Sequence, residues 1–135
     1  MARFAVRRLE DVPTIDTAEG DPAWFPLQHY FRFTAFGVNV YVAEHQGAEL
    51  VAAHDESASG QEELYIVTSG EATFTIGGEH VDAPATTVVA IPDPSVVRAG
   101  HAKAAGTTLI AIGGERRSEF RSSWQPKWFE SAPQV

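Results

Sequence analysis

Residues 63–71 read ELYIVTSGE, and this stretch decides the fold class. Its part from Leu64 to Thr68 is rich in β-branched and aromatic side chains, which favour an extended strand. After Gly70, residues 72–76 have the same strand character. The pair Gly77-Gly78 then predicts a two-residue hairpin turn, because such a turn needs positive φ at both positions.

Further strand-like segments lie on both sides of this stretch, separated by glycine or proline at intervals of about eight to twelve residues. Residues 36–44 alternate in the period of a strand. The other predicted strands are 49–53, 79–82, 87–91, 96–99 and 107–112. Only residues 115–123 have helical character. Many short antiparallel strands with such turns indicate an all-β sandwich, jelly roll or barrel.

The composition narrows the class of protein further. The chain has 135 residues, which fits one domain, and no cysteine, which excludes disulfides, thiolate nucleophiles and cysteine-bound metals. A net charge of −8 without a basic stripe disfavours nucleic-acid binding. No apolar run reaches the roughly 20 residues of a membrane span, and none suits a signal peptide. We therefore expect a cytoplasmic protein without nucleic-acid or membrane partners.

The residues best suited to chemistry are His54, Glu56 and Glu63. Residues i and i+2 of a strand share a face, so His54 and Glu56 would point the same way. If residues 55–62 reverse the chain, Glu63 lies beside them. An imidazole and two carboxylates on one wall could hold a divalent ion. There is no glycine-rich phosphate loop and no G-x-S-x-G nucleophile elbow in the sequence.

These residues resemble the first motif of the cupin superfamily, which runs G, five residues, H-x-H, three or four residues, E, six residues, G. Gly47, His54, Glu56, Glu63 and Gly70 stand at its positions, with one extra residue before the histidine and two or three extra before Glu63. Residues 63–71 also resemble the E-x-x-Y-V-x-x-G-E hairpin of cupins. The second motif maps to Thr86, Pro92-Asp93-Pro94, Val97 and His101, and keeps only its proline.

The resemblance implies a cupin-type double-stranded β-helix, a jelly-roll barrel, with an N-terminal strand segment and a short C-terminal tail. We expect a single cupin domain over residues 1–135, with the barrel core at about 36–113. Residues 1–35 would pack on the barrel, and residues 114–135 would form a tail anchored by Trp124, Trp128 and Phe129. Because cupins commonly dimerise, a homodimer is also expected.

The family's metal site takes two histidines and a glutamate from the first motif and a third histidine from the second. Here Glu56 replaces the second histidine, and Val97, which cannot ligate, replaces the third. A site of His54, Glu56 and Glu63 would be oxygen-rich and would favour manganese or magnesium over tightly bound zinc or copper. The resemblance allows manganese, iron, nickel or zinc as the cofactor.

A metal-free interpretation of the same residues is equally specific. Glu63 in a dry interior must be paired, hydrogen-bonded or neutral. Protonated His54 could be its partner, and so could Arg98 if a strand bulge turns it inward. His101 is expected in a solvated loop.

Three functions remain open from the sequence. The first is a binder of a small molecule without a full metal site. Its pocket would be lined by His54, Glu56, Glu63, Tyr65, Phe74 and Val97. The second is a metal-dependent enzyme (a dioxygenase, isomerase or decarboxylase) using the His/Glu/Glu site. The third is a scaffold whose barrel is filled by side chains.

Overall fold

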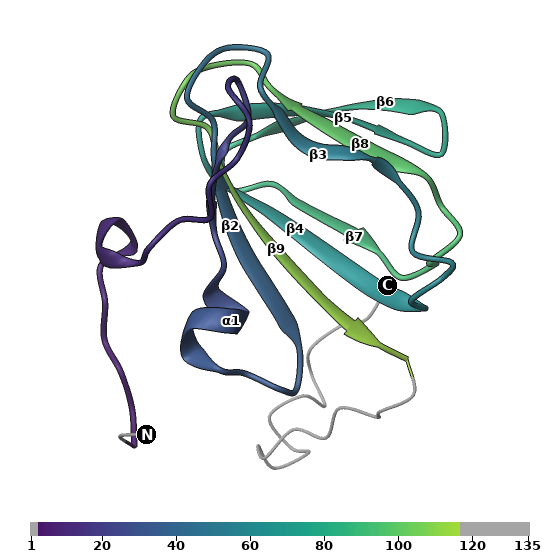
Figure 1. Cartoon of the computed structure of the whole chain (residues 1–135). Coiled ribbons are helices and arrows are strands. Elements are labelled where there is room, and N and C mark those ends of the chain that lie inside the picture. Colours follow the sequence, from purple (N-terminus) through teal and green to yellow (C-terminus); the bar gives the residue numbers. More distant parts are fainter. Residues whose placement is uncertain (1–2, 117–135) are drawn as a thin grey trace, which may run out of the picture.

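Two antiparallel sheets face each other in the computed structural model, which describes residues 3–116 (Figure 1). The first sheet has the order β1-β2-β9-β4-β7 and the second β3-β8-β5-β6. The strands are β1 Ala23–Phe25, β2 Gly37–Val42, β3 Glu49–His54, β4 Gln61–Ser69, β5 Glu71–Ile76, β6 Glu79–Pro84, β7 Val88–Ile91, β8 Arg98–Ala102 and β9 Thr108–Glu115. The sheets diverge at one end, so the predicted jelly roll is confirmed but the barrel is not closed.

The strands predicted from the sequence are all present, with shifted ends. The Gly77-Gly78 hairpin joins β5 to β6, and its glycines have φ of 56° and 82°. Strand β8 differs most from expectation, because it begins at Arg98, two residues after the predicted start. This shift decides which side chains of β8 face inward.

The N-terminal region holds more structure than the expected strand segment. A 3-10 turn, η1 (Leu9–Asp11), and a helix, α1 (Leu27–Phe31), flank β1, which pairs with β2. Neither helical element was predicted. Helical structure was expected instead at residues 115–123, where Glu115 ends β9 and Arg116 lies in a turn. Residues 117–123 lie outside the described residues, as do Trp124, Trp128 and Phe129. Within residues 3–116 no helix has the length and apolarity needed to cross a membrane.

The core lies between the sheets and is built by alternate residues of the strands. On β4, Tyr65 and Val67 are buried, and Tyr65 packs on Phe74 of β5 with ring centroids 5.7 Å apart. Gly70, at the turn between these strands, has φ of 72°, and a Cβ there would clash with Thr107 Oγ1. The glycine of the first motif is therefore required by both backbone conformation and space.

The turn between β6 and β7 contains a strained residue. Thr86 has φ of 72°, a conformation that β-branched residues rarely adopt. Its amide donates a 2.7 Å hydrogen bond to the carbonyl of Val67, which holds the turn against β4. Thr86 occupies the position that is glycine in the second cupin motif, and this φ explains why glycine suits it.

We expect Thr86→Gly to stabilise the protein by about 1 kcal/mol, because it relieves the positive-φ strain while the amide hydrogen bond remains. Thr75→Gly, at an exposed position within β5, is the matched control and should destabilise by roughly 0.5–1 kcal/mol. Urea denaturation of the three proteins measures both effects. Equal destabilisation by the two substitutions would show that Thr86 carries no strain.

Candidate functional site

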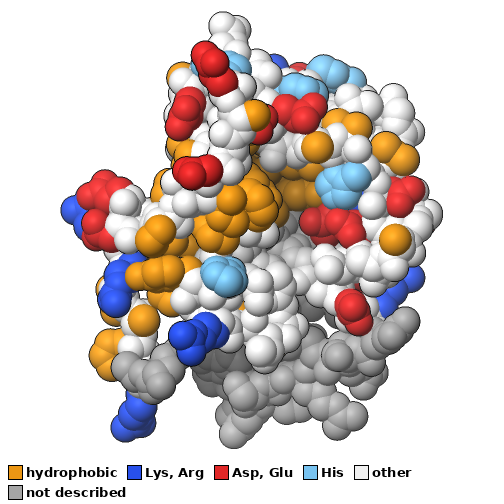
Figure 2. All heavy atoms as spheres, in the orientation of Figure 1, with side chains coloured by type: hydrophobic (Ala, Val, Ile, Leu, Met, Phe, Trp, Pro, Cys, Tyr) orange, Lys and Arg blue, Asp and Glu red, His pale blue; other side chains and the backbone are white. Residues whose placement is uncertain are grey.

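A cavity of about 540 Å³ opens between the two sheets at their divergent end. Figure 2 shows hydrophobic side chains gathered in the hollow of this face, with acidic and histidine side chains around it. The cavity is lined by Thr17, Asp21, Pro22, Trp24, Gly37, Asn39, Tyr41, Glu49, Leu50, Val51, Ala52, His54, Glu56, Gln61, Glu63, Tyr65, Ala111 and Gly113. Both sheets and the segment before β1 therefore contribute to it.

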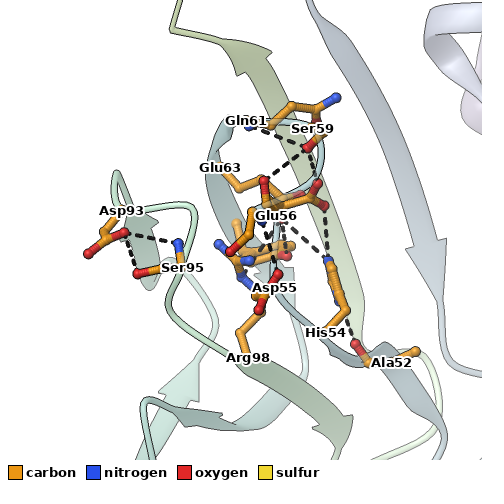
Figure 3. A network of polar contacts seen from close by, with 12 residues as sticks. Ala52, His54, Asp55, Glu56, Ser59, Gln61, Glu63, Asp93, Ser95 and Arg98 are labelled. Carbon is orange, nitrogen blue, oxygen red and sulfur yellow. Dashed lines mark hydrogen bonds and ion pairs between the residues drawn. The ribbon is translucent and has the colours of Figure 1, made fainter.

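His54, Glu56 and Glu63 come together in one wall of this cavity (Figure 3). His54 ends β3, Glu56 follows in the loop, and Glu63 lies on β4 of the opposite sheet. His54 Nε2 is 3.1 Å from Glu56 Oε1 and 3.6 Å from Glu63 Oε1. One ligand atom from each residue lies within 4.8 Å of the others, so the three donors are close enough to share one ion.

The orientation of His54 is fixed by its own strand. Its Nδ1 lies 2.6 Å from the carbonyl oxygen of Ala52, an acceptor, so Nδ1 carries the proton and donates it. Nε2 consequently faces the two carboxylates, either as a second donor or with a free lone pair. This arrangement suits both a protonated imidazole between two carboxylates and a metal-ligating imidazole.

The loop between β3 and β4 positions Glu56. Its backbone amide donates to the carbonyl of Pro94 at 2.7 Å, and its carbonyl accepts from the amide of Gly60 at 2.7 Å. The Ser59 hydroxyl donates to Oε2, which leaves Oε1 directed at His54. The carboxylate is thus held from two sides and is oriented before any ligand binds.

Glu63 is flanked by a phenol and a buried guanidinium. Tyr65 donates its hydroxyl to Glu63 Oε1 at 2.9 Å, and Arg98 Nε lies 3.8 Å from the same oxygen. The Arg98 side chain is 0% exposed, and its three guanidinium nitrogens have no hydrogen-bond partner within the described part of the chain. A buried cation is costly unless paired, so the negative charge of Glu63 is its main compensation.

Register shifts between β3 and β8 explain why Arg98 points inward. Two irregularities in this pairing place His54 opposite Arg98, and directly opposed residues share a face of the sheet. Along β8, Arg98, Gly100 and Ala102 are buried. The inward orientation that the sequence left conditional is therefore adopted.

Two predicted pocket residues lie elsewhere. Val97 precedes β8, is 53% exposed and does not line the cavity, because its neighbour Arg98 takes the inward position. Phe74 is fully buried in the core and does not reach the cavity either. His54, Glu56, Glu63 and Tyr65 do line it. His101 is half exposed and lies 3.7 Å from Glu49.

Sequence reasoning missed a polar and aromatic part of the wall. Trp24 lines the cavity and donates its indole N–H to Asn39 Oδ1 at 2.8 Å. Tyr41 lies beside Trp24, with ring centroids 6.2 Å apart. The available signal was the alternation in β2, where Asn39 and Tyr41 face the cavity while Val38 and Val40 are buried on the other face.

The negative charge of Glu63 affects the pKa of both tyrosines that line the cavity. Burial, then the nearby Glu63 charge, raises the pKa of Tyr65 far above its ordinary value of 10.0. The same two causes, in the same order, raise the pKa of Tyr41. Both phenols therefore remain protonated at neutral pH, and each can act only as a neutral hydroxyl towards a ligand.

Comparison with known proteins shows which solved structures share this fold. No family model and no curated protein matches the sequence. Among solved structures, the chain is similar to a cupin protein from Bacteroides fragilis, with a TM-score of 0.63, 19% identity, and 93% of this chain and 98% of that one covered.

Two similar structures have activities in their names. One is a sugar phosphate isomerase of the cupin superfamily from Silicibacter pomeroyi (TM-score 0.59, 18% identity, 70% of this chain covered), of which this chain spans 59%. The other is Streptomyces Pac13 with uridine (TM-score 0.60, 14% identity, 84% and 83% covered), named a nucleoside dehydratase. These likenesses confirm the cupin resemblance at the level of the fold.

We expect the free energy of unfolding to fall as the pH rises above about 10. Since the folded pKa of Tyr65 is raised, the unfolded chain loses its phenol proton first, and stability is fully present below the unfolded pKa and lost above it. Tyr65→Phe should show a shallower decline between about pH 9 and 11 in denaturant titrations. Parallel declines in the two proteins would contradict the raised pKa.

Proposed function

We propose that this chain, which has the cupin fold, binds a small polar organic molecule in the cavity between its sheets. The observation that carries the proposal is the cavity itself, because it is roomy and contains an oriented set of polar groups. Its volume of about 540 Å³ lies within the range of small-molecule sites. A scaffold with a filled interior would have no such space at this end.

The polar groups in the wall suit a hydroxyl- or amine-bearing ligand. Glu56 and Glu63 offer acceptor oxygens, whereas the hydroxyl of Tyr41 and the amide of Gln61 offer donors. Most of these side chains are already fixed by neighbours, so ordering them on binding costs little. Leu50, Val51 and Ala111 supply the apolar part of the wall.

Arg98 supports binding without a metal ion. Arg98 carries a permanent positive charge beside Glu63, so part of the negative charge of the cluster is compensated without any ion. A divalent ion bound by Glu63 would share this carboxylate with a guanidinium whose Nε lies 3.8 Å from Oε1. Two positive charges at one carboxylate repel each other, and burial makes the repulsion stronger.

The similar structures support a small-molecule ligand as a class. Their names connect this fold with a sugar phosphate isomerase and with a nucleoside dehydratase bound to uridine. Both are enzymes acting on small hydroxylated molecules. Because one fold hosts many activities, these names support a pocket ligand for this chain and assign no reaction to it.

A divalent metal ion in the same wall is the second candidate. The grouping of His54, Glu56 and Glu63, with the histidine Nε2 directed at the carboxylates, favours it. The donor set fits a hard ion such as manganese, which would supply Lewis-acid chemistry when bound. Arg98 opposes it, so the expected affinity is low.

Filling the cavity tests ligand binding directly. The untagged protein is incubated with a small-molecule cell extract and examined by native mass spectrometry, where the parent should retain a low-mass adduct. Ala52→Trp places a large ring at the cavity wall and should abolish the adduct. Ala53→Trp is the matched control, since Ala53 is exposed and does not line the cavity, and it should retain the adduct. Equal adducts in both variants would locate binding elsewhere.

Replacing the internal cation tests the metal alternative. Arg98→His puts an imidazole at the inward position and removes the opposing charge, so manganese or nickel should bind at least about tenfold more tightly than to the parent. Val97→His adds the same imidazole one residue away, at an exposed position, and should bind no better than the parent. Isothermal titration calorimetry measures both.

A measurement on the parent protein would contradict the metal-free proposal. Near-stoichiometric manganese, iron, nickel or zinc in the purified, untagged parent, detected by elemental mass spectrometry and lost in His54→Ala, would replace the metal-free proposal by the metal-dependent one.

A further inference from the structure

We propose that the ligand of this cavity is an organic cation, a small molecule with a protonated or quaternary nitrogen. This inference rests on the proposed binding function and adds the chemical class of the ligand. Four carboxylates line the cavity, from Asp21, Glu49, Glu56 and Glu63. In the described part of the chain no lysine or arginine does so.

The two pairs of carboxylates are in different situations. Glu56 and Glu63 are engaged by His54, Ser59, Tyr65 and Arg98, so several of their oxygens are occupied and Arg98 compensates the charge of Glu63. Asp21 accepts only the backbone amide of Ala18, at 3.1 Å, among the described contacts. Glu49 has one described neighbour of this kind, the imidazole of half-exposed His101, at 3.7 Å. Acceptor oxygens remain on both for a cationic nitrogen.

The aromatic part of the wall favours the same class of ligand. Trp24 and Tyr41 line the cavity with their rings tilted by 32° to each other. The bond from Trp24 Nε1 to Asn39 fixes the indole, and Tyr65 adds a third ring to the wall. The faces of aromatic rings carry negative electrostatic potential and attract cations, above all those of low hydration. Carboxylates next to such rings form a complementary environment for an alkylated or ring-bearing ammonium group.

The electrostatic field inside the cavity supports this choice. The cavity carboxylates come from both sheets, with Glu49 on β3 and Glu63 on β4, and from the segment before β1, which holds Asp21. The nearest guanidinium, that of Arg98, is buried and does not line the cavity. A phosphate or carboxylate would therefore meet four carboxylates, with His54 as the one basic side chain among the described lining residues. The ligand class differs in this respect from the sugar phosphate named for the Silicibacter protein.

The test uses three probes with one molecular body and different charge: 2-phenylethylamine, 2-phenylethanol and phenylacetate. Binding to the full chain is followed by ¹H–¹⁵N chemical-shift titration in EDTA at low salt. The amine should bind at least about tenfold more tightly than the alcohol, and the carboxylate should not bind measurably. The shifts should map to cavity residues, and the affinity of the amine should fall as salt is raised.

Variants show whether the two carboxylates at the rim of the cavity, those of Asp21 and Glu49, are responsible for the preference for the amine. Asp21→Asn and Glu49→Gln should each weaken the amine several-fold and leave the alcohol unchanged. Glu79→Gln removes the same charge from the exposed edge strand β6, outside the cavity, and should change neither.

Failure of the charge claim and failure of the binding claim give different results. If the alcohol or the carboxylate binds as well as the amine, and Ala52→Trp abolishes that binding, the cavity is a ligand site but the cationic class is wrong. If no probe shifts a cavity residue and the parent retains no adduct from cell extract, both proposals are overturned. Amine binding that Asp21→Asn and Glu49→Gln leave unchanged also overturns the cationic class.

Discussion

The site depends on one ion pair that spans the two sheets. Glu63 on β4 and Arg98 on β8 meet across the interior, and Arg98 is wholly removed from solvent. A buried guanidinium without a carboxylate would be strongly unfavourable, so each residue requires the other. The pair also fixes what surrounds it, because Tyr65 donates to the same Glu63 oxygen and His54 lies opposite Arg98 in the neighbouring strand pairing (Figure 3).

This pair gives the wall a different chemistry from that of a metal-binding cupin. In a metal-binding cupin, an ion taken up from solution compensates the charge of the glutamate. In this chain, the buried side chain of Arg98 compensates the charge of Glu63. A guanidinium has no lone pair to offer and cannot act as a Lewis acid towards a ligand. The face of Glu63 that lines the cavity therefore acts through its charge and its acceptor oxygens, which is why binding and orientation are the functions that fit the wall best.

The sequence predicted the fold better than the site, for a physical reason. Strand character and turn glycines are local, so the jelly roll and the Gly77-Gly78 hairpin could be predicted. Which face a side chain takes depends on register, and an error of one residue reverses it. Val97 was assigned the inward position that Arg98 holds, because the irregular pairing of β3 with β8 has no local signal. Trp24 reaches the cavity only through the pairing of β1 with β2.

The cavity therefore divides into two parts with different electrostatics. Where Glu56 and Glu63 lie, Arg98 compensates the charge of Glu63 and hydroxyl donors occupy carboxylate oxygens, so a ligand gains mainly directed hydrogen bonds. Where Asp21 and Glu49 lie, next to an exposed histidine and a backbone amide, the charge is less compensated and attracts cations from solution. A ligand that is hydroxylated at one end and cationic at the other would satisfy both parts at once. A ligand bound in the reverse direction would leave the carboxylates of Asp21 and Glu49 without a cation. Its positive charge would instead lie beside His54 and Glu63, where Arg98 already compensates the carboxylate.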